Sequence, residues 1–277
     1  MTDAIKRMSL YQQIDRVFNE LRAAGIKDGD PIPLEVLSAF DQLHYLGTQA
    51  VDSGISALSI TASTRVLEVG GGIGGPARHL AQHAQCHVTA LELQADLNDT
   101  AIQLTQRCGL DDRIEHRCAD ILDHSLGDKT FDALVSWLTF LHIPDRPKLY
   151  RQCFDAMKPG AGLFVEDYFE KNALSASERA ALSSEVYCDF VPTLDAYRSD
   201  LAGAGFIHVE LIDMSEVWAS FVRDRYDKFK SARDRNVSIH GAPIVDALEQ
   251  FYDTIVALFE AGNLGGIRFT ARKPRNP

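Results

Sequence analysis

The sequence predicts an α/β protein with a doubly wound, Rossmann-like sheet of seven strands. It also predicts N-terminal helices and a helical lid inserted between the last two strands. Three observations support this fold class. Strand-like and helix-like segments alternate from residue 65 onward, a pattern typical of a parallel sheet covered by helices. Five glycines occupy the six positions 70–75, directly after the first predicted strand. A long helical stretch, residues 215–262, separates two later strand-like segments.

The part of the chain before the sheet, residues 1–60, is predicted to form an N-terminal helical cap. Apolar side chains recur at helical spacing over residues 4–24. The segment GIKDGDPIP, 25–33, is rich in turn residues and is predicted to be a loop. Residues 34–58 are predicted to form one or two more helices, and the segment DQLHYLG, 41–47, is placed on the helix before the sheet.

Residues 61–214 are predicted to form the core of the fold. The predicted strands are 65–70, 86–92, 113–118, 131–137, 161–167 and 206–214. The predicted helices between them are 77–84, 96–108, 146–157, 175–190 and 193–203. The segment KPGAG, 158–162, contains the residues of a turn and is predicted to be one, directly before the fifth strand.

The end of the chain is predicted to contain the lid and the last strand. Two helices, 215–235 and 242–261, are separated by the turn-like segment SIHGAP. A final core strand, 265–273, lies in the last segment of the chain, 263–277. The lid is therefore expected to lie between the sixth and seventh strands and to cover a pocket at the ends of strands four and five.

The glycine-rich loop predicts a ligand site. Residues 65–76 read RVLEVGGGIGGP, in which an apolar strand runs into the glycines, and Pro76 is placed at the first position of the following helix. Only glycine allows the backbone to bend this sharply and to approach a ligand closely. A ligand on this loop would lie at a helix N-terminus and at the carboxyl end of a strand, which is the usual crevice of an open α/β sheet.

The glycines by themselves are compatible with two cofactors. Gly70, Gly72 and Gly75 satisfy the G-x-G-x-x-G pattern of dinucleotide sites, which is a weak signal when it stands alone. This pattern makes an NAD(P)-dependent oxidoreductase the alternative class of enzyme. Glu68, two positions before the first glycine, favours S-adenosylmethionine (SAM) instead. A carboxylate suits the cationic amino-acid tail of SAM and repels a pyrophosphate.

Two further acidic residues follow the next two strands. Glu92 ends the second strand, where a carboxylate can accept both ribose hydroxyls of SAM, and Asp120 ends the strand-like segment 113–122, where it can meet the adenine amino group. One such acid alone could be a solvated loop carboxylate, but three at successive strand ends form a specific pattern. The predicted cofactor-binding residues are Glu68, Gly70, Gly71, Gly72, Glu92, Leu93, Asp120, Ile121 and Ser136.

With these motifs the chain resembles class I SAM-dependent methyltransferases. From about residue 40 onward it is also similar to the sarcosine/dimethylglycine and phosphoethanolamine N-methyltransferase group. The similarity rests on the segments DQLHYLG, SWLTFLHIPD, KPGAGLFVEDYF and ALFEAGNLGGIRFTARK. The resemblance implies an enzyme that uses SAM (EC 2.1.1.-) and methylates a small molecule, with N-methylation of an amine as the first expectation.

One residue departs from the pattern of that group. Its members typically carry an aspartate that holds the substrate amine, four positions before the histidine equivalent to His142. Here that position is Leu138, and an apolar side chain cannot pair with an ammonium group. O- or C-methylation of a natural-product intermediate is therefore the alternative reaction. A SAM-binding protein without catalytic activity is the alternative from another class.

The acceptor is expected over the strand ends that face the methyl group. His142, after the fourth strand, has the only side chain with a near-neutral pKa in the segment 135–145 and is the predicted catalytic residue. The competing interpretation is that it caps the next helix or satisfies a buried carbonyl. The predicted substrate-binding residues are His44, Tyr45, Trp137 and Tyr168. The aromatic residues of the lid are predicted to form its own core.

Composition limits the partners of the chain. Its 277 residues carry a formal net charge of −11, which argues against nucleic acid because a basic binding surface is missing. The five cysteines are widely spaced, so we expect reduced thiols and no metal site. The mixed and charged N-terminus does not resemble a signal peptide. We expect a cytoplasmic monomer or homodimer that acts on a small-molecule acceptor and does not bind a membrane.

Overall fold

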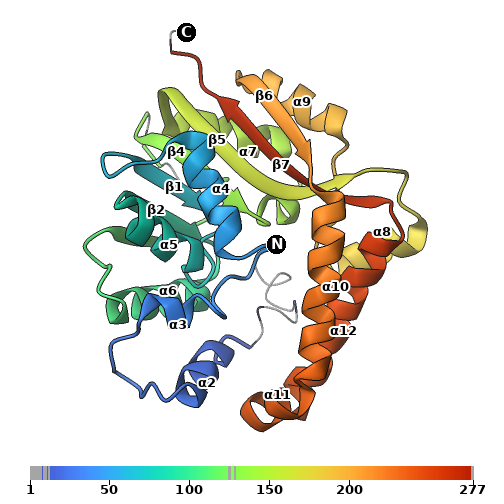
Figure 1. Ribbon diagram of the computed structural model, residues 1–277. Coiled ribbons are helices and arrows are strands. Elements are labelled where there is room, and N and C mark those ends of the chain that lie inside the picture. Colours follow the sequence, from blue (N-terminus) through green and yellow to red (C-terminus); the bar gives the residue numbers. More distant parts are fainter. Residues whose placement is uncertain (1–7, 9–10, 12, 124–125, 128, 276–277) are drawn as a thin grey trace.

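The computed structural model describes residues 8, 11, 13–123, 126–127 and 129–275 of the chain (Figure 1). A single sheet of seven strands crosses the molecule in the order β3-β2-β1-β4-β5-β7-β6. The strands are β1 Arg65–Val69, β2 His87–Glu92, β3 Ile114–Cys118, β4 Phe131–Trp137, β5 Met157–Glu170, β6 Ile207–Asp213 and β7 Leu264–Arg272. The predicted α/β class and the seven-stranded sheet are confirmed.

The sheet is mixed, because its last strand runs against the others. Strands β1 to β5 pair in parallel, whereas β7 is antiparallel to both β5 and β6. The parallel strands end at one edge of the sheet, and β1 lies between β2 and β4. From β1 the chain continues to β2 on one side and later to β4 on the other, so the order of the strands reverses at β1. Such a reversal opens a crevice at the carboxyl end of the strand.

Helices cover both faces of the sheet (Figure 1). On one face, α4 (Thr48–Leu58) and α5 (Gly75–Ala84) bury apolar side chains against β1, β2 and β4. On the other face, α7 (Arg146–Ala156) and α9 (Leu194–Gly203) pack on β4, β5 and β7. Alongside, α6 (Ala95–Arg107) packs on β2 and β3.

The N-terminal region differs from the predicted cap. Within the described residues, helix α2 covers only Arg16–Ala23, and residues 13–15 form a turn; the remaining start of the predicted helix 4–24 lies largely outside the described residues. Helix α3 covers Leu34–Leu37. The segment 41–47 is a loop and not part of a helix. The last two residues of this loop, before α4 begins, have positive φ: Leu46 at 60° and Gly47 at 53°.

Two other predicted elements differ from the structure. The segment 158–162 belongs to β5, where Gly160 (φ 85°) accompanies a shift of register against β4 and replaces the predicted turn with a bulge. The helix predicted at 175–190 divides into α8 (Ala176–Ala181) and the wider turn η2 (Leu182–Val186), and it ends where Tyr187 adopts a left-handed backbone.

The predicted helical insertion between the last two strands is present. It consists of α10 (Ser215–Ser231), α11 (Arg233–His240) and α12 (Ala242–Glu260), which project as a bundle beyond the sheet (Figure 1). Its sequence SIHGAP is not a loop, because residues 238–240 continue α11 and only Gly241 breaks the helix. No helix of the described residues is long and apolar enough to cross a membrane.

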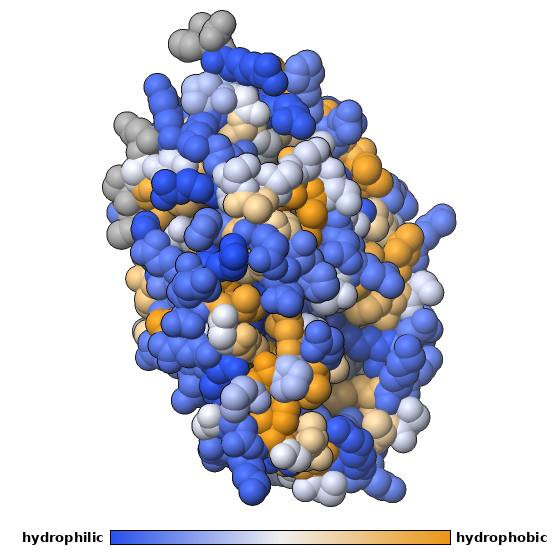
Figure 2. All heavy atoms as spheres, turned by 60° about the vertical axis from the view of Figure 1, so that its left-hand side comes forward, coloured by the Kyte–Doolittle hydropathy of each residue, from blue (hydrophilic) through white to orange (hydrophobic). Residues whose placement is uncertain are grey.

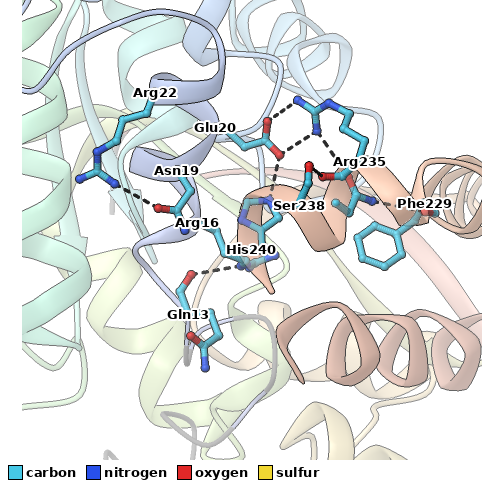
Figure 3. A network of polar contacts seen from close by, with 10 residues as sticks. Gln13, Arg16, Asn19, Glu20, Arg22, Phe229, Arg235, Ser238 and His240 are labelled. Atoms are coloured by element: carbon cyan, nitrogen blue, oxygen red, sulfur yellow. Dashed lines mark hydrogen bonds and ion pairs between the residues drawn. The ribbon is translucent and has the colours of Figure 1, made fainter. Parts of the chain in front are cut away.

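The insertion is tied to the N-terminal region by one charged residue of α2. The Glu20 carboxylate accepts hydrogen bonds from Arg235 Nη2 at 2.7 Å and pairs with His240 Nε2 at 2.9 Å, both on α11 (Figure 3). The Glu20 side chain is 15% exposed. These partners lower the pKa of Glu20 against the opposing effect of its burial.

Replacing Glu20 with glutamine should loosen α11 without unfolding the protein. The stabilisation is expected to be at most about 1 kcal/mol, since Arg235 is largely exposed and solvent screens the pair. Hydrogen exchange should accelerate in α11. Because the folded-state pKa is lowered, the contribution is present above the pKa of the unfolded chain and is lost as pH falls through the folded value. Arg22→Gln, which removes the exposed pair with Asp28, is the control and should leave α11 unchanged.

Candidate active site

A cavity lies at the carboxyl ends of β1, β2 and β4. It is lined by the glycine loop, the turn after β3, the segment after β4 and the loop 41–47. It contains every predicted cofactor-binding residue except Ser136, together with the predicted catalytic residue and two of the four predicted substrate-binding residues. Segments far apart in the sequence therefore meet where the sheet topology opens a crevice.

The glycine loop bends because three of its residues, Gly70, Gly72 and Gly74, have positive φ. Gly70 has φ 83°, and a Cβ atom there would lie 1.9 Å from the hydroxyl oxygen of Thr139. Gly72 has φ 52°, and an added Cβ would meet nothing nearer than 4.0 Å. The first glycine is thus required by close packing inside the protein. The second keeps the backbone bent and leaves open space above it for a ligand.

The carboxyl group of Glu68 is buried and has no hydrogen-bond partner in the part of the chain that the structure describes. The Glu68 side chain is at the end of β1 and 1% exposed, and neither carboxylate oxygen forms a hydrogen bond with any described residue. Burial raises the pKa of Glu68 well above its usual range, with Arg78 acting against the rise and Glu92 adding to it. An unpaired buried acid is costly to keep, and a cationic ligand group would supply the missing partner.

Glu92 connects the end of β2 to the glycine loop. Its Oε2 accepts a hydrogen bond from the Gly72 N–H at 2.8 Å, and its Oε1 accepts one from the Gln94 N–H at 2.9 Å. Each oxygen keeps a second lone pair, so the carboxylate can still accept two hydroxyl groups from a ligand. Burial raises the pKa of Glu92, against the effect of these two backbone donors.

The predicted adenine side of the cavity is formed by the turn after β3. That strand ends at Cys118, so Asp120 lies two residues beyond it and not at its end. The Asp120 Oδ1 accepts a hydrogen bond from the Leu122 N–H at 2.8 Å. Leu93 and Ile121 line the same part of the cavity. An acidic oxygen between apolar walls can hold a flat ring that carries an amino group.

Ser136 does not belong to this cavity, contrary to the prediction. Its side chain is fully buried in β4, and its hydroxyl donates a hydrogen bond to the Val69 carbonyl at 2.7 Å. Side chains alternate between the two faces of a strand, and the sequence alone did not establish which face the cavity uses. Other lining residues were not predicted, and they come from separate segments; Tyr11, Leu43, Gln94 and Thr139 are among them.

His142 reaches the cavity from the short helix η1 (Phe140–His142) after β4. Its side chain is 8% exposed, and its Nδ1 lies 3.2 Å from the Tyr187 carbonyl. A carbonyl only accepts hydrogen bonds, so this contact places the ring proton on Nδ1 and leaves Nε2 with a free lone pair. The Tyr11 ring lies edge-on to the His142 ring, and the two ring centroids are 6.2 Å apart.

The surroundings of His142 keep its ring neutral. Burial lowers the pKa of His142, and Arg146 acts in the same direction, while the Tyr187 carbonyl and Asp167 act against both. The ring therefore satisfies a buried carbonyl, as one interpretation expected, and at the same time presents a basic nitrogen. The two interpretations do not exclude each other.

His44 and Trp137 form a stacked pair in the cavity wall, with ring centroids 5.8 Å apart. Both ring nitrogens of His44 are engaged, with the Tyr45 carbonyl and the Gln42 side chain, each at 3.0 Å. Burial lowers the pKa of His44 to about 4, so it is neutral at physiological pH. The His44 ring is therefore better suited to pack its flat face against a ligand than to transfer a proton.

Tyr45 and Tyr168 do not line this cavity, contrary to the prediction. Their hydroxyl groups bond to each other, and both rings are buried against Trp218 and Phe259. They connect the loop 41–47 and the end of β5 to the helical insertion. A polar residue in an apolar pattern indicated a site, but the sequence could not reveal that two such residues satisfy each other.

Comparisons with known proteins agree with this geometry. Residues 66–160 match the family model described as a methyltransferase domain. Phosphoethanolamine N-methyltransferase 1 of Zea mays is 28% identical over 210 residues, which cover 76% of this chain and 40% of that protein. The 27-O-demethylrifamycin SV methyltransferase of Amycolatopsis mediterranei is 26% identical over 236 residues, covering 84% of this chain and 85% of that protein.

The fold has a near match among solved structures. Phosphoethanolamine N-methyltransferase 2 of Haemonchus contortus, solved with phosphomonomethylethanolamine and S-adenosylhomocysteine, superposes with a TM-score of 0.83 at 19% identity and covers 99% of this chain and 60% of that one. The chain spans about two fifths of the length of the plant relatives that it matches. It therefore has the class I methyltransferase fold, and residues 66–160 match a methyltransferase domain.

Proposed function

We propose that the protein transfers the methyl group of SAM to a small molecule. The observation that carries this proposal is the partnerless Glu68 carboxylate under the glycine loop. It lies in one cavity with Glu92 and Asp120. A cationic amino-acid tail, a pair of ribose hydroxyls and an adenine amino group match these three acids. A pyrophosphate on the same loop would lie beside the buried Glu68 carboxyl group, which disfavours the oxidoreductase alternative.

The residues of this chain would bind and orient both reactants. SAM supplies an electrophilic methyl group on its sulfonium. Glu68, Glu92 and Asp120 would hold the cofactor, and His142 would accept or orient the proton of the attacking group through Nε2. The stacked pair His44 and Trp137 would form the wall beside the acceptor. The helices α10 to α12 would act as the lid that excludes water from the site.

Two kinds of methyl acceptor are supported, an amine and a hydroxyl group. An amine is the first candidate, because the relatives with these segments are named as N-methyltransferases. A hydroxyl is the second, and the specific observation in its favour is Leu138, an apolar residue that lines the cavity at φ 52°. A neutral histidine base suits a hydroxyl, whose proton must leave before or during attack. A relative that matches over 84% of this chain and 85% of its own length is an O-methyltransferase by its name.

A binding experiment tests the cofactor directly. Tryptophan fluorescence of the full chain should change on titration with SAM and with S-adenosylhomocysteine, and not with NADH, because Trp137 lines the cavity. Formation of S-adenosylhomocysteine with amine and hydroxyl acceptors would then separate the two reactions. Binding of NADH in place of SAM would contradict the proposal. Binding of SAM without turnover on any acceptor would favour the non-catalytic alternative.

The variant Gly72→Val should abolish SAM binding and leave a folded protein. At φ 52° a valine is strained, and its side chain would extend into the open space above the loop. Gly109→Val is a matched control, since Gly109 has φ 67° with no atom within 4 Å of an added Cβ. The control carries similar backbone strain outside the cavity and should bind SAM normally. Equal SAM affinity in both variants would show that the loop does not hold the cofactor.

A further inference from the structure

A second cavity, of about 300 Å³, lies beside the first. The two share three wall residues, Leu43, Ile73 and Leu97. Residues of α2, of the segment after α3, of α10 and of α12 complete its wall, so it lies between the N-terminal region and the helical insertion. In the space-filling view, apolar side chains gather in the lower half of the molecule beside a hollow, on a face that is otherwise mostly hydrophilic (Figure 2).

The wall of this cavity combines apolar and polar side chains, and two arginines, Arg16 and Arg225, contribute to it. Val17, Phe40, Phe229 and Leu248 supply apolar surface. Arg225, on α10, has its guanidinium carbon 5.0 Å from the centre of the Tyr45 ring and 4.8 Å from that of the Tyr252 ring. Its Nε is buried and forms no hydrogen bond with any described residue.

The charges around Arg225 leave it without an acidic partner. Among the described residues, no carboxylate lies within ion-pairing distance of its guanidinium, in contrast to Arg223 on the same helix, which pairs with Glu260. Glu20 also lines the cavity, but it is engaged by Arg235 and His240. The Tyr45 hydroxyl bonds to Tyr168 and also forms a side-chain hydrogen bond with Arg225. This hydroxyl and the aromatic faces lessen the cost of a partly buried cation but do not supply a counter-charge.

We propose that this second cavity holds the body of the methyl acceptor and that Arg225 binds an oxyanion on it. The acceptor would then be an apolar molecule that carries a carboxylate or phosphate group at the end remote from the methylated atom. Arginine suits both groups, because its planar fork can donate two parallel hydrogen bonds. This inference rests on the proposed methyltransferase function and names the class of acceptor.

The test uses the full chain saturated with S-adenosylhomocysteine, with benzoate as an apolar carboxylate and inorganic phosphate as the second anion. Both are titrated by calorimetry at constant ionic strength. At least one of them should bind. Arg225→Gln should weaken its binding by about tenfold or more, as loss of a charged hydrogen bond requires, and Arg225→Lys should weaken it less. Binding of benzoate alone identifies a carboxylate, and binding of phosphate alone a phosphate.

Two further variants keep the result interpretable. Arg223→Gln removes an arginine of the same helix that is already paired, so anion binding should be unchanged. Phe229→Glu places a carboxylate one helical turn from Arg225 on the cavity wall. This carboxylate should pair with Arg225 and abolish anion binding while the arginine itself stays in place.

Three outcomes would overturn the inference. They are no anion binding by the wild type, equal weakening in Arg223→Gln and Arg225→Gln, and unchanged binding in Phe229→Glu. The proposed function is judged separately by the binding of S-adenosylhomocysteine. If S-adenosylhomocysteine binds and neither anion does, only the acceptor inference fails. If S-adenosylhomocysteine itself does not bind, the proposed function fails as well.

Discussion

Replacing His142 with alanine is expected to lower the turnover number by about 10²–10⁴-fold, the usual contribution of a general base. The affinity for SAM should change little, because the ring reaches the cavity from the segment after β4 and not from the glycine loop. His142→Gln keeps a hydrogen-bonding group without basicity. A glutamine variant close to wild type would show that the residue only orients the acceptor. A fully active alanine variant would show that it is structural.

The pH profile provides a second test of the same residue. Burial lowers the pKa of His142, so Nε2 stays unprotonated below the usual histidine range near pH 6.5. The rate should therefore be level around pH 7 and should fall only in more acidic solution, as the ring takes up a proton. An ordinary histidine would already lose activity close to neutrality. A midpoint at or above pH 6.5 would contradict the buried, carbonyl-bonded geometry.

Glu68→Gln is expected to separate cofactor binding from stability. The amide cannot form a charged hydrogen bond with an ammonium group, and such bonds contribute about 1.5–3 kcal/mol each, which corresponds to a loss of SAM affinity of at least about tenfold. The ligand-free variant should nevertheless be more stable than the wild type at pH 7, because it no longer buries a partnerless carboxyl group that must be kept from ionising.

The sign of the stability effect follows from the direction of the pKa shift. The folded-state pKa of Glu68 is raised, so the wild type loses stability as pH rises above the pKa of the unfolded chain. Urea unfolding should show the stability advantage of the variant shrinking as pH falls toward about 4, near the pKa of an unperturbed glutamate. Glu166→Gln is the matched control: this buried acid is paired with Arg268. Its removal should destabilise the protein and spare SAM binding.

The wild type and Glu68→Gln also distinguish the two cofactor classes. If the cavity served a dinucleotide, removal of this acid would relieve repulsion and would improve binding of NADH. If it serves SAM, the same change weakens binding. A Glu68→Gln variant that binds SAM as tightly as the wild type would exclude a role for this carboxylate in holding the cofactor.

The sequence by itself determined the fold class and located the glycine loop and three acids that line one cavity. Strand and helix periodicities are local properties, and apolar runs identified β1, β2 and β4 within a residue or two. The acids Glu68 and Glu92 lie at the ends of β1 and β2, and Asp120 lies in the turn that follows β3. Parallel pairing brings such ends together without further information, so their common cavity could be predicted from chain order.

Only the tertiary structure decided what each polar side chain does. Ser136, Tyr45 and Tyr168 have the residue types of a site, but each meets a partner from a distant segment. The sequence does not record which residues satisfy one another across the fold. The same limit hid Arg225, which resembles Arg223 in the sequence. One of the two pairs with Glu260 at the surface and the other lines a cavity without an acidic partner, because packing of α10 against α12 and the loop 41–47 determines which charges find a counterion.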